Sequence, residues 1–479
     1  MYARNLIPAI EAIGSRVAGR ALNFRAGPRA TLKAVIAAAM VALFPAAAEA
    51  VPAFAQQTGQ PCTSCHVGAF GPQLTPFGRS FKIGGYTEAG GELKPQIPLA
   101  LMFLGSYSNT TKGQGTPAAN NYGANGNFAM DQISIFLAGR INDYAGAMIQ
   151  GTFDGIGSAF FLDNTDLRFT APFTVHDTEL RLGLDVNNGP TVQDPYNSTY
   201  AWGYPFVASA LVPTPTAQPL LAGGLIGNSV GATVYAWYNR ALYLEGGLYN
   251  TYGPSLLSWT GQAYGPGSTA NPAPYLRAAY EWNWNGQSAH IGGIFLHSNI
   301  NPAYAPFSST GSLGHDNYTD YAVDGGYQFL GNGTHVVSLD AIVDHENGNL
   351  VGSFNSGAAS QAGNSLNQVR ATATYYYKQT YGLTGSWQKT WGSADPLLFP
   401  SQPLSGSANG KPNSNAFIIE ADWVPFGKAD SWAGPFVNLK LGAQYTIYTQ
   451  FNGGASNYDG FGRNASDNNT LYVFAWLIF

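Results

Sequence analysis

The sequence predicts an all-β protein, a 16-stranded transmembrane β-barrel preceded by a short N-terminal segment of different character. Three observations support this fold class. Only 10% of the 479 residues are charged, against roughly a quarter in ordinary globular proteins. Aromatic residues make up 14% and there are 59 glycines, yet no apolar run after residue 50 is long enough for a spanning helix. This composition is typical of strands that alternate lipid-facing and lumen-facing residues.

The first 50 residues have the pattern of an export signal. A basic region leads into the apolar run 34–48, and Ala-Glu-Ala at 48–50 offers a small-residue cleavage site. The apolar run is too short, and interrupted by Pro45, to span a membrane. We expect residues 1–50 to be a signal peptide, with cleavage after Ala55 as the alternative. The mature chain would then work outside the inner membrane.

Both cysteines of the chain lie in the sequence Cys62-Thr-Ser-Cys65-His66. This spacing is that of a covalent attachment site for c-type haem, in which two thiols add to the vinyl groups and the next histidine faces the iron. A zinc site would need a second Cys/His pair, which the sequence lacks. A redox Cys-x-x-Cys pair or an ordinary disulfide remains the alternative. We predict one haem c attached to Cys62 and Cys65, with His66 as the proximal iron ligand.

From residue 98 onward the chain divides into alternating segments of about ten residues, which is the pattern of barrel strands. The sixteen predicted strands are 98–108, 127–141, 144–154, 162–172, 176–187, 228–238, 241–250, 274–285, 288–297, 316–329, 333–346, 364–378, 380–392, 413–425, 436–450 and 469–479. Short turns, such as Asn285-Gly286, alternate with long Gly/Ser/Asn/Pro loops, such as 188–227. Outer-membrane barrels place short turns in the periplasm and long loops outside. Both ends of the barrel domain, residues 98–479, are therefore predicted to be periplasmic.

Polarity alternates within the strands. In 274–284, aliphatic and aromatic residues at even positions oppose Arg277 and Glu281 at odd positions. An arginine or lysine on the lipid face near mid-bilayer costs about 2–4 kcal/mol, so the charged set is predicted to face the lumen. The terminal Phe479 resembles the C-terminal assembly signal of bacterial outer-membrane barrels. A soluble β-sandwich or β-helix is the alternative, which sixteen paired segments and so few charges disfavour.

Residues 51–97 are predicted to be a monohaem cytochrome c segment, and this is small for a domain that must enclose a haem alone. No His or Met lies between residues 67 and 97, so the sixth iron position is filled from the strands, filled by a rarer ligand, or open. Candidates from the strands, inward-facing by alternation, are Met102, Met130 and Met148, and the rarer candidates are Lys82, Lys94 and Tyr86. We predict that this segment is a plug in the lumen or at its periplasmic mouth, with the barrel completing the haem pocket.

Two stretches, Pro52–His66 and Leu74–Tyr86, resemble the outer-membrane monohaem c-type cytochromes fused to a porin, a family implicated in ferrous-iron oxidation by iron-oxidising bacteria. Over the rest of the chain the likeness is architectural. The resemblance implies a protein that takes electrons from extracellular Fe(II), acting as a ferrous-iron oxidase. It implies that these electrons pass through the haem to a periplasmic cytochrome or copper protein.

Carried over residue by residue, the resemblance makes Cys62 and Cys65 the haem attachment points and His66 the proximal ligand. Arg79 and Lys82 lie in the second stretch. We predict that they are partners of the haem propionates, because arginine forks suit carboxylates. A solvated basic pair is the alternative.

The net charge of the chain and the place of its carboxylates limit which partners and metal sites the protein can have. The net charge of −5 without a basic cluster excludes nucleic acid as a partner, and leaves outer-membrane lipid as the surroundings of the barrel. The carboxylates expected in the lumen are Asp166, Glu179, Asp320, Asp324, Asp340, Glu420 and Asp422. More than half of them are expected to pair with lumen-facing arginines and lysine, so none is assigned as an iron site.

Three further functions compete with iron oxidation. One is a haem-bearing porin or transport channel in which the haem is a sensor. Another is a conduit that carries electrons outward and is not specific for iron. A third is a barrel that encloses a separate multihaem cytochrome, which is disfavoured because this chain carries its own haem motif.

Overall fold

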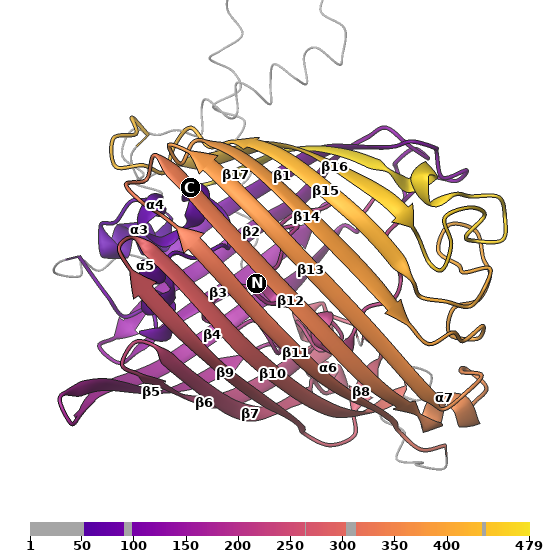
Figure 1. The fold of residues 1–479 in the computed structure, drawn as a ribbon, viewed down its shortest axis with the longest axis horizontal. Coiled ribbons are helices and arrows are strands. Elements are labelled where there is room, and N and C mark those ends of the chain that lie inside the picture. The colour runs from indigo at the N-terminus through magenta and orange to yellow at the C-terminus, as the bar shows by residue number, and fades with distance from the viewer. Residues whose placement is uncertain (1–51, 91–97, 264, 303–312, 434–436) are drawn as a thin grey trace, which may run out of the picture. The chain divides into compact units, whose positions relative to one another are not determined.

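The described part of the chain is a closed antiparallel β-barrel (Figure 1). The structure is a computed structural model that describes residues 52–90, 98–263, 265–302, 313–433 and 437–479. The predicted signal peptide and the candidate ligand Lys94 lie outside these residues. Strand β17 pairs with β1, so within the described residues the sheet closes on itself. One strand, β8 (Gly267–Thr269), has only three residues, and the other sixteen form the wall.

Each wall strand pairs with the next along the chain. The wall strands are β1 (Leu99–Thr110), β2 (Asn127–Asn142), β3 (Ala145–Asp154), β4 (Ala159–Val175), β5 (Thr178–Asn187), β6 (Ser229–Tyr238), β7 (Leu242–Thr251), β9 (Ala273–Trp284), β10 (Gln287–Pro302), β11 (Asp316–Phe329), β12 (His335–Leu350), β13 (Gly363–Tyr377), β14 (Tyr381–Gly392), β15 (Ser414–Trp423), β16 (Asn438–Gln450) and β17 (Thr470–Ile478). The sixteen-stranded barrel predicted from the sequence is therefore confirmed. β10 runs past its predicted end, residue 297, because β11 pairs with residues 298–300 and β8 with residues 300–302.

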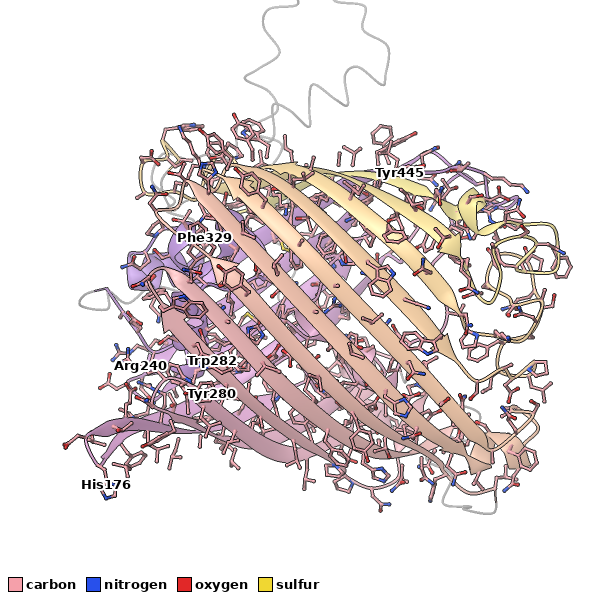
Figure 2. All side chains as sticks on the ribbon, viewed as in Figure 1. His176, Arg240, Tyr280, Trp282, Phe329 and Tyr445 are labelled. Carbon is pink, nitrogen blue, oxygen red and sulfur yellow. The ribbon has the colours of Figure 1, made fainter. Side chains whose placement is uncertain are left out.

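The outer face of the wall is apolar and the inner face polar. On β9, Tyr280 and Trp282 are 41% and 49% exposed, whereas Arg277 and Glu281 are 2% and 4% exposed. Figure 2 shows Tyr280 and Trp282 on the outer face. A closed sheet pairs its backbone N–H and C=O groups within the wall, so it can pass through hydrocarbon. The barrel is the membrane-spanning part of the protein. Among the described residues, no helix has the length and apolar character needed to cross a membrane.

The two ends of the barrel differ. The links at one end, which we name the short-turn end, are 143–144, 176–177, 239–241, 285–286, 330–334, 378–380 and 424–437. Most links at the other end, the long-loop end, are long. Two links depart from this alternation, since 155–158 is short and 424–437 is long. β1 begins and the chain finishes at the short-turn end, where Leu101 and Phe479 exchange backbone hydrogen bonds of 2.7 and 2.9 Å.

Residues 52–90, which we name the N-terminal segment, lie within the barrel. They form helices α3 (Ala53–Thr58), α4 (Cys62–Cys65) and α5 (Pro76–Ile83) and the 3₁₀ turn η1 (Val67–Ala69). Their side chains reach strands on several sides of the lumen. Arg79 bonds to β9 at 2.7 Å, Gln73 to β12 at 2.6 Å and Tyr86 to β4 at 2.7 Å. These contacts with inward-facing residues fix the segment inside the wall.

The link between β5 and β6, residues 188–228, also enters the lumen. The sequence predicts an external loop here, and that prediction is wrong. Asp194 of this inward link pairs with Arg277 of β9 at 3.0 Å, with both side chains fully buried. Arg370 of β13 donates to the carbonyl of Ser198 at 3.1 Å. The link folds inward because its carboxylate and carbonyl groups are partners for arginines that the wall turns away from lipid.

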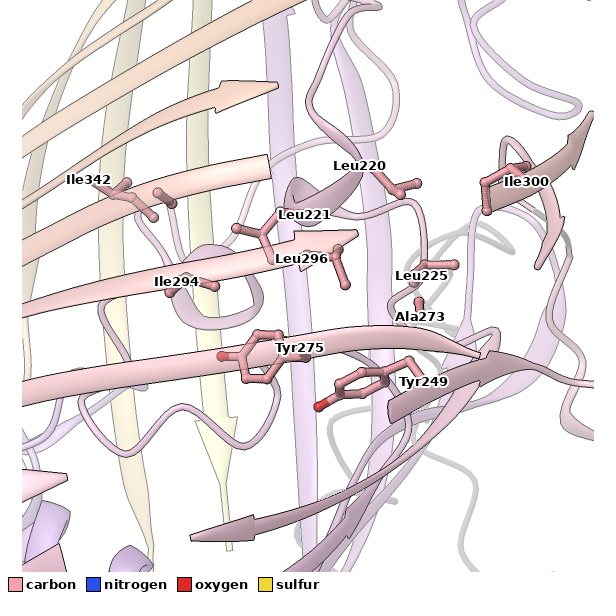
Figure 3. Close-up of a cluster of buried hydrophobic side chains, with 11 residues drawn as sticks. Leu220, Leu221, Leu225, Tyr249, Ala273, Tyr275, Ile294, Leu296, Ile300 and Ile342 are labelled. Atoms are coloured by element: carbon pink, nitrogen blue, oxygen red, sulfur yellow. The ribbon is translucent and has the colours of Figure 1, made fainter. Parts of the chain in front are cut away.

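Apolar packing holds the second half of the inward link. Leu220, Leu221 and Leu225 are buried against inward residues of β7, β9, β10, β11 and β12 (Figure 3). Figure 3 shows Leu221 close to Ile294 and Leu296. Burying a leucine side chain stabilises a fold by about 1.5–3 kcal/mol. The inward link is therefore anchored by both charge pairing and apolar burial.

Candidate haem-binding site

Helix α4 brings the three residues of the Cys-x-x-Cys-His motif together. The N–H of His66 donates to the carbonyl of Cys62 at 2.8 Å, closing one helical turn. Residues three apart on a helix share a face, so both thiols lie on one side. The N–H of Thr75 donates to the carbonyl of Cys65 at 2.9 Å. A Cβ atom at Gly78 would lie 2.3 Å from that carbonyl oxygen, so α5 can pack this closely only with glycine there.

Local sequence explains why α5 starts where it does. The hydroxyl of Thr75 accepts a hydrogen bond from the N–H of Gly78 at 3.2 Å, which caps the helix. Pro76 follows in the first turn, where a missing N–H costs nothing. Phe81 on α5 then packs edge-on against Phe54 of α3, with ring centroids 5.0 Å apart. The three helices thus form one small unit around the motif.

A cavity of about 490 Å³ opens beside α4 and is lined by Cys62, Cys65 and His66 together. This volume lies within the range of about 300–1,000 Å³ that is usual for ligand pockets. Its walls come from the N-terminal segment, from strands of the barrel and from the inward link 188–228. Aromatic rings supply much of the wall, namely Phe54, Phe81, Phe136, Trp202, Phe206 and Trp476. The barrel and the inward link therefore complete a pocket that the short N-terminal segment could not form alone.

The chemistry of the motif residues fits a c-type haem. Desolvation by the surrounding protein lowers the pKa of His66 to about 4, so its imidazole is neutral at pH 7. Neutral imidazole is the form that binds metals. The ring lies near the backbone of Gly71, and its buried Nδ1 atom has no hydrogen-bond partner of ordinary geometry. A ligating histidine commonly directs its second nitrogen to a carbonyl, and the Gly71 backbone is suitably close.

The two thiols do not have the properties of a redox pair. Both cysteines are free. Burial raises the pKa of Cys62, and it raises the pKa of Cys65 to about 12. Reactive Cys-x-x-Cys pairs depend on a lowered thiol pKa, which is the opposite shift. The donor set of two adjacent thiols, one neutral imidazole and an aromatic cavity fits haem attachment better than thiol exchange.

The structure separates the three methionine candidates. Met102 on β1 is 4% exposed, and both it and Met148 on β3 line the cavity. Met130 on β2 is 45% exposed and does not line it. The prediction that Met130 faces inward is wrong because a β-bulge at Asp131 shifts the register, so that Leu104 opposes Gln132 while Gly105 opposes Met130. The bulge turns Met130 to the outer face.

Arg79 and Lys82 lie in different surroundings. The guanidinium of Arg79 is only 2% exposed and is bound by Glu281, Gln328, Ser288 and the carbonyl of Leu74. It does not line the cavity, so a propionate role for Arg79 does not fit this geometry. Its buried partners make it an anchor between α5 and the wall.

Lys82 does line the cavity. Its Nζ atom donates to the carbonyl of Val192 and to the side chain of Asn197, both at 2.9 Å, and lies 3.9 Å from Asp166. Desolvation lowers its pKa to about 8. Lys82 therefore remains a predicted propionate partner, and a solvated position is excluded by its 4% exposure.

Sequence reasoning missed the contribution of the inward link. Asn197, Trp202 and Phe206 line the cavity although they follow the motif by more than a hundred residues. Trp202 lies under the Lys82 ammonium, which is 5.0 Å from its ring centroid. The aromatic cluster at 200–206 was the available signal, because exposed external loops seldom concentrate aromatic residues.

Five of the seven predicted lumen carboxylates, all except Asp320 and Asp340, are engaged in ion pairs, as expected. Arg168 pairs with Asp166 and Asp185, Arg277 with Asp194 and Asp324, Lys440 with Glu420 and Asp422, and Arg181 with Glu179. Within the described residues, no group of three or more His, Cys, Asp or Glu side chains is arranged to hold a metal ion. We therefore assign no residue to a binding site for a free iron ion.

Comparison with known proteins adds information on the barrel alone. No protein-family model and no curated protein matches the chain. The chain is similar to the solved structure of OmpF from Salmonella typhi in complex with daunomycin, with a TM-score of 0.46 and 12% identity over 80% of this chain and 97% of that one. An anion-selective porin from Comamonas acidovorans gives a TM-score of 0.44 and 12% identity over 79% of this chain and 98% of that one. OprB from Pseudomonas putida at high pH also gives 0.44 and 12%, over 80% and 94%.

These three proteins are outer-membrane barrels, and the likeness to them is too low to carry over a ligand or an activity. The chain's own pairing and outward apolar belt give it the architecture of bacterial outer-membrane barrels of the porin type.

Proposed function

We propose that this protein is an outer-membrane electron-transfer protein that holds one covalent haem c in the lumen cavity. In this function, electrons pass between a donor outside the cell and a carrier in the periplasm. The observation that carries the proposal is that Cys62, Cys65 and His66 line one cavity of about 490 Å³. The barrel supplies the passage through the membrane, and the cavity supplies the place for a redox group within it.

Each group at the site has a defined part in holding the haem. The thiols of Cys62 and Cys65 would form the two thioether bonds, and the neutral His66 would bind the iron. The aromatic walls would limit the contact of the haem with water, which favours a higher reduction potential. Lys82 offers a positive charge to a propionate. When bound, the haem supplies a one-electron carrier that an external donor can reduce and a soluble protein can reoxidise.

Extracellular Fe(II) is the proposed donor, and this rests on the resemblance of Pro52–His66 and Leu74–Tyr86 to the iron-oxidising cytochrome–porin family. Oxidised iron precipitates, so a carrier within the barrel lets the metal stay outside. The proposed acceptor is a periplasmic cytochrome or copper protein. This proposal requires the short-turn end and both termini of the barrel to lie in the periplasm. Aqueous Fe(II) could transfer an electron at the surface without a dedicated site.

A haem-bearing transport channel is the second candidate function, and the porin-type barrel favours it. The contacts of the lumen argue against a wide channel. The N-terminal segment and the inward link both cross the lumen and are held there by buried pairs, among them Arg79–Glu281 and Asp194–Arg277. An electron conduit that runs outward uses the same haem and differs only in its partners.

The test is expression in a host with the haem c maturation apparatus. The purified protein should show a Soret band and keep its haem after denaturation, and Cys62→Ala/Cys65→Ala should lose both. Absence of the band in correctly folded barrel would overturn the proposal. Stopped-flow mixing with ferrous sulfate should reduce the haem. If dithionite reduces the haem and ferrous sulfate does not, Fe(II) is not the donor. A large open-channel current of the haem-loaded protein in planar bilayers would favour transport.

A further inference from the structure

The link 424–437 is the exception among the turns of the short-turn end, and it contacts the haem-binding motif. The other links there have no more than five residues each. The N–H of Thr63, between the two motif cysteines, donates to the carbonyl of Gly427 at 3.2 Å. Asn438, just after the link, donates its side-chain amide to the carbonyl of Ala69 at 2.6 Å. The longer link therefore contacts the edge of helix α4 through Gly427.

A surface depression of about 830 Å³ lies at this place. It is lined by Thr63 and Ser64 of α4, by residues 75–77 at the start of α5, by the turns 330–334 and 378–380, and by Lys428 and Asp430 of the long link. The depression thus brings solvent to the outer side of the helix whose cysteines face the haem cavity. A protein that binds over this depression would come close to the motif.

The depression carries a small excess of positive charge, two lysines against one aspartate, on a negative chain. Its charged residues are Lys378, Lys428 and Asp430, whereas the whole chain has a net charge of −5. Lys378 is exposed, and its Nζ atom lies 5.4 Å from the ring centroid of Tyr377. Lys428 is fixed by hydrogen bonds from Nζ to the carbonyls of residues 424 and 425, at 3.0 and 3.1 Å. A fixed positive charge favours a partner with an acidic face.

The link that contributes Lys428 and Asp430 to the depression also carries an exposed tryptophan, two residues after Asp430. Trp432 in the same link is 88% exposed, and its ring packs edge-on against Phe426 with centroids 5.1 Å apart. Tryptophan is among the residues that contribute most to protein interfaces. Complexes of electron-transfer proteins are small and weak, so one aromatic anchor with a few steering charges suffices.

We propose that Thr63, Ser64, Lys378, Lys428 and Trp432 form a docking face for a small soluble redox protein with an acidic surface. The inference rests on the proposed function, since it names the chemistry of the partner that exchanges electrons with the haem site. Docking makes no covalent bond. One electron is lost by the carrier of this chain and gained by the copper or haem iron of the partner.

The test measures binding of a labelled, zinc-substituted plastocyanin, an acidic protein that cannot be reduced, to the purified full-length barrel in detergent at low ionic strength. Lys378→Glu should weaken binding about tenfold and reduce its salt dependence. Trp432→Ala should also weaken it about tenfold. Two matched controls, Lys411→Glu at the long-loop end and Tyr144→Ala on a different short turn, should leave binding within about twofold.

A probe protein of the opposite charge provides a second measurement. A basic mitochondrial cytochrome c should bind the wild-type protein more weakly than plastocyanin, and Lys378→Glu should reverse this order. Equal effects of the docking variants and their controls, or tighter binding of the basic protein to wild type, would overturn the docking face. The binding signal does not depend on haem. A missing Soret band with intact plastocyanin binding would therefore reject the proposed function and leave the docking face standing.

Discussion

The guanidinium of Arg79 lies 2.7 Å from the carboxylate of Glu281, and their side chains are only 2% and 3% exposed. The pair joins helix α5 to strand β9 across 202 residues of sequence. Ser288 and Gln328 accept two further hydrogen bonds from the same guanidinium, at 2.8 and 3.0 Å. This buried cluster ties the N-terminal segment to the wall of the barrel.

Removing one charge of this pair should loosen the N-terminal segment. Glu281→Gln leaves the buried guanidinium of Arg79 without its counter-ion, at a cost of about 3–5 kcal/mol. We expect protease cleavage within residues 52–90 at a lower urea concentration than in the wild type, while the barrel stays intact. The double variant Arg79→Met/Glu281→Met is the control, since replacing both charges by apolar groups should restore most of the stability. Cleavage of Glu281→Gln at the wild-type urea concentration would contradict the anchoring role.

The wall strands could be predicted because their pattern is set locally. Lipid on one side and a polar lumen on the other impose alternation on each strand, and Arg277 and Glu281 on β9 face inward as that alternation requires. The bulge at Asp131 could not be predicted, because it is set by how β2 pairs with β1. One extra residue there reversed the side on which Met130 lies.

The position of the inward link depends on contacts that are distant in sequence. Residues 188–228 have the Gly, Asn and Pro content of an external loop, and nothing local shows that Asp194 pairs with Arg277. For the site, the motif predicted that Cys62, Cys65 and His66 act together because haem attachment would fix their spacing. The role of Arg79 could not be predicted from the sequence in this way, because its partners come from β9, β10 and β11.

Methionine variants should identify the sixth iron ligand. Met102 and Met148 both line the cavity with His66, so one of Met102→Leu and Met148→Leu should abolish the weak red absorption band of methionine-ligated ferric haem. Met130→Leu is the matched control, because Met130 is on the outer face and its loss should leave the spectrum unchanged. Unchanged bands in both cavity variants would exclude methionine ligation by this cavity.

Lys82 should give the segment a pH-dependent stability. Desolvation lowers its pKa from 10.5 to about 8, so between these values the folded chain holds fewer protons than the unfolded one. The free energy of unfolding should then rise with pH through this window, by on the order of 3 kcal/mol in all. The measurement is the urea midpoint for release of residues 52–90 in the haem-free Cys62→Ala/Cys65→Ala protein.

Adding Lys82→Met to this haem-free protein should make the free energy of unfolding nearly independent of pH between about pH 8 and pH 10.5. A propionate near Lys82 would stabilise its ammonium form, so the haem-loaded protein should show a smaller rise than the haem-free protein. The same slope with and without Lys82 would contradict the assignment of the effect to this side chain.

The inward link should limit conductance, and Asp194 is one of the residues that hold it in the lumen. Its carboxylate accepts backbone N–H groups of residues 196, 198 and 199 at 3.1, 3.0 and 3.1 Å, and it pairs with Arg277 at 3.0 Å. Asp194→Asn keeps much of the hydrogen bonding but removes a buried counter-charge, which costs about 3 kcal/mol or more. We expect large, fluctuating single-channel currents in planar bilayers, where the wild type stays nearly closed.

The control is Asp459→Asn in the loop between β16 and β17. Asp459 is also buried, at 2% exposure, and accepts N–H groups of residues 461 and 463 at 2.8 and 3.1 Å. No ion pair joins it to the wall among the described residues. Its loss should disturb that loop without opening the lumen. If the Asp194→Asn and Asp459→Asn proteins show the same single-channel conductance, the inward link does not close the barrel. The N-terminal segment must then account for any closure by itself.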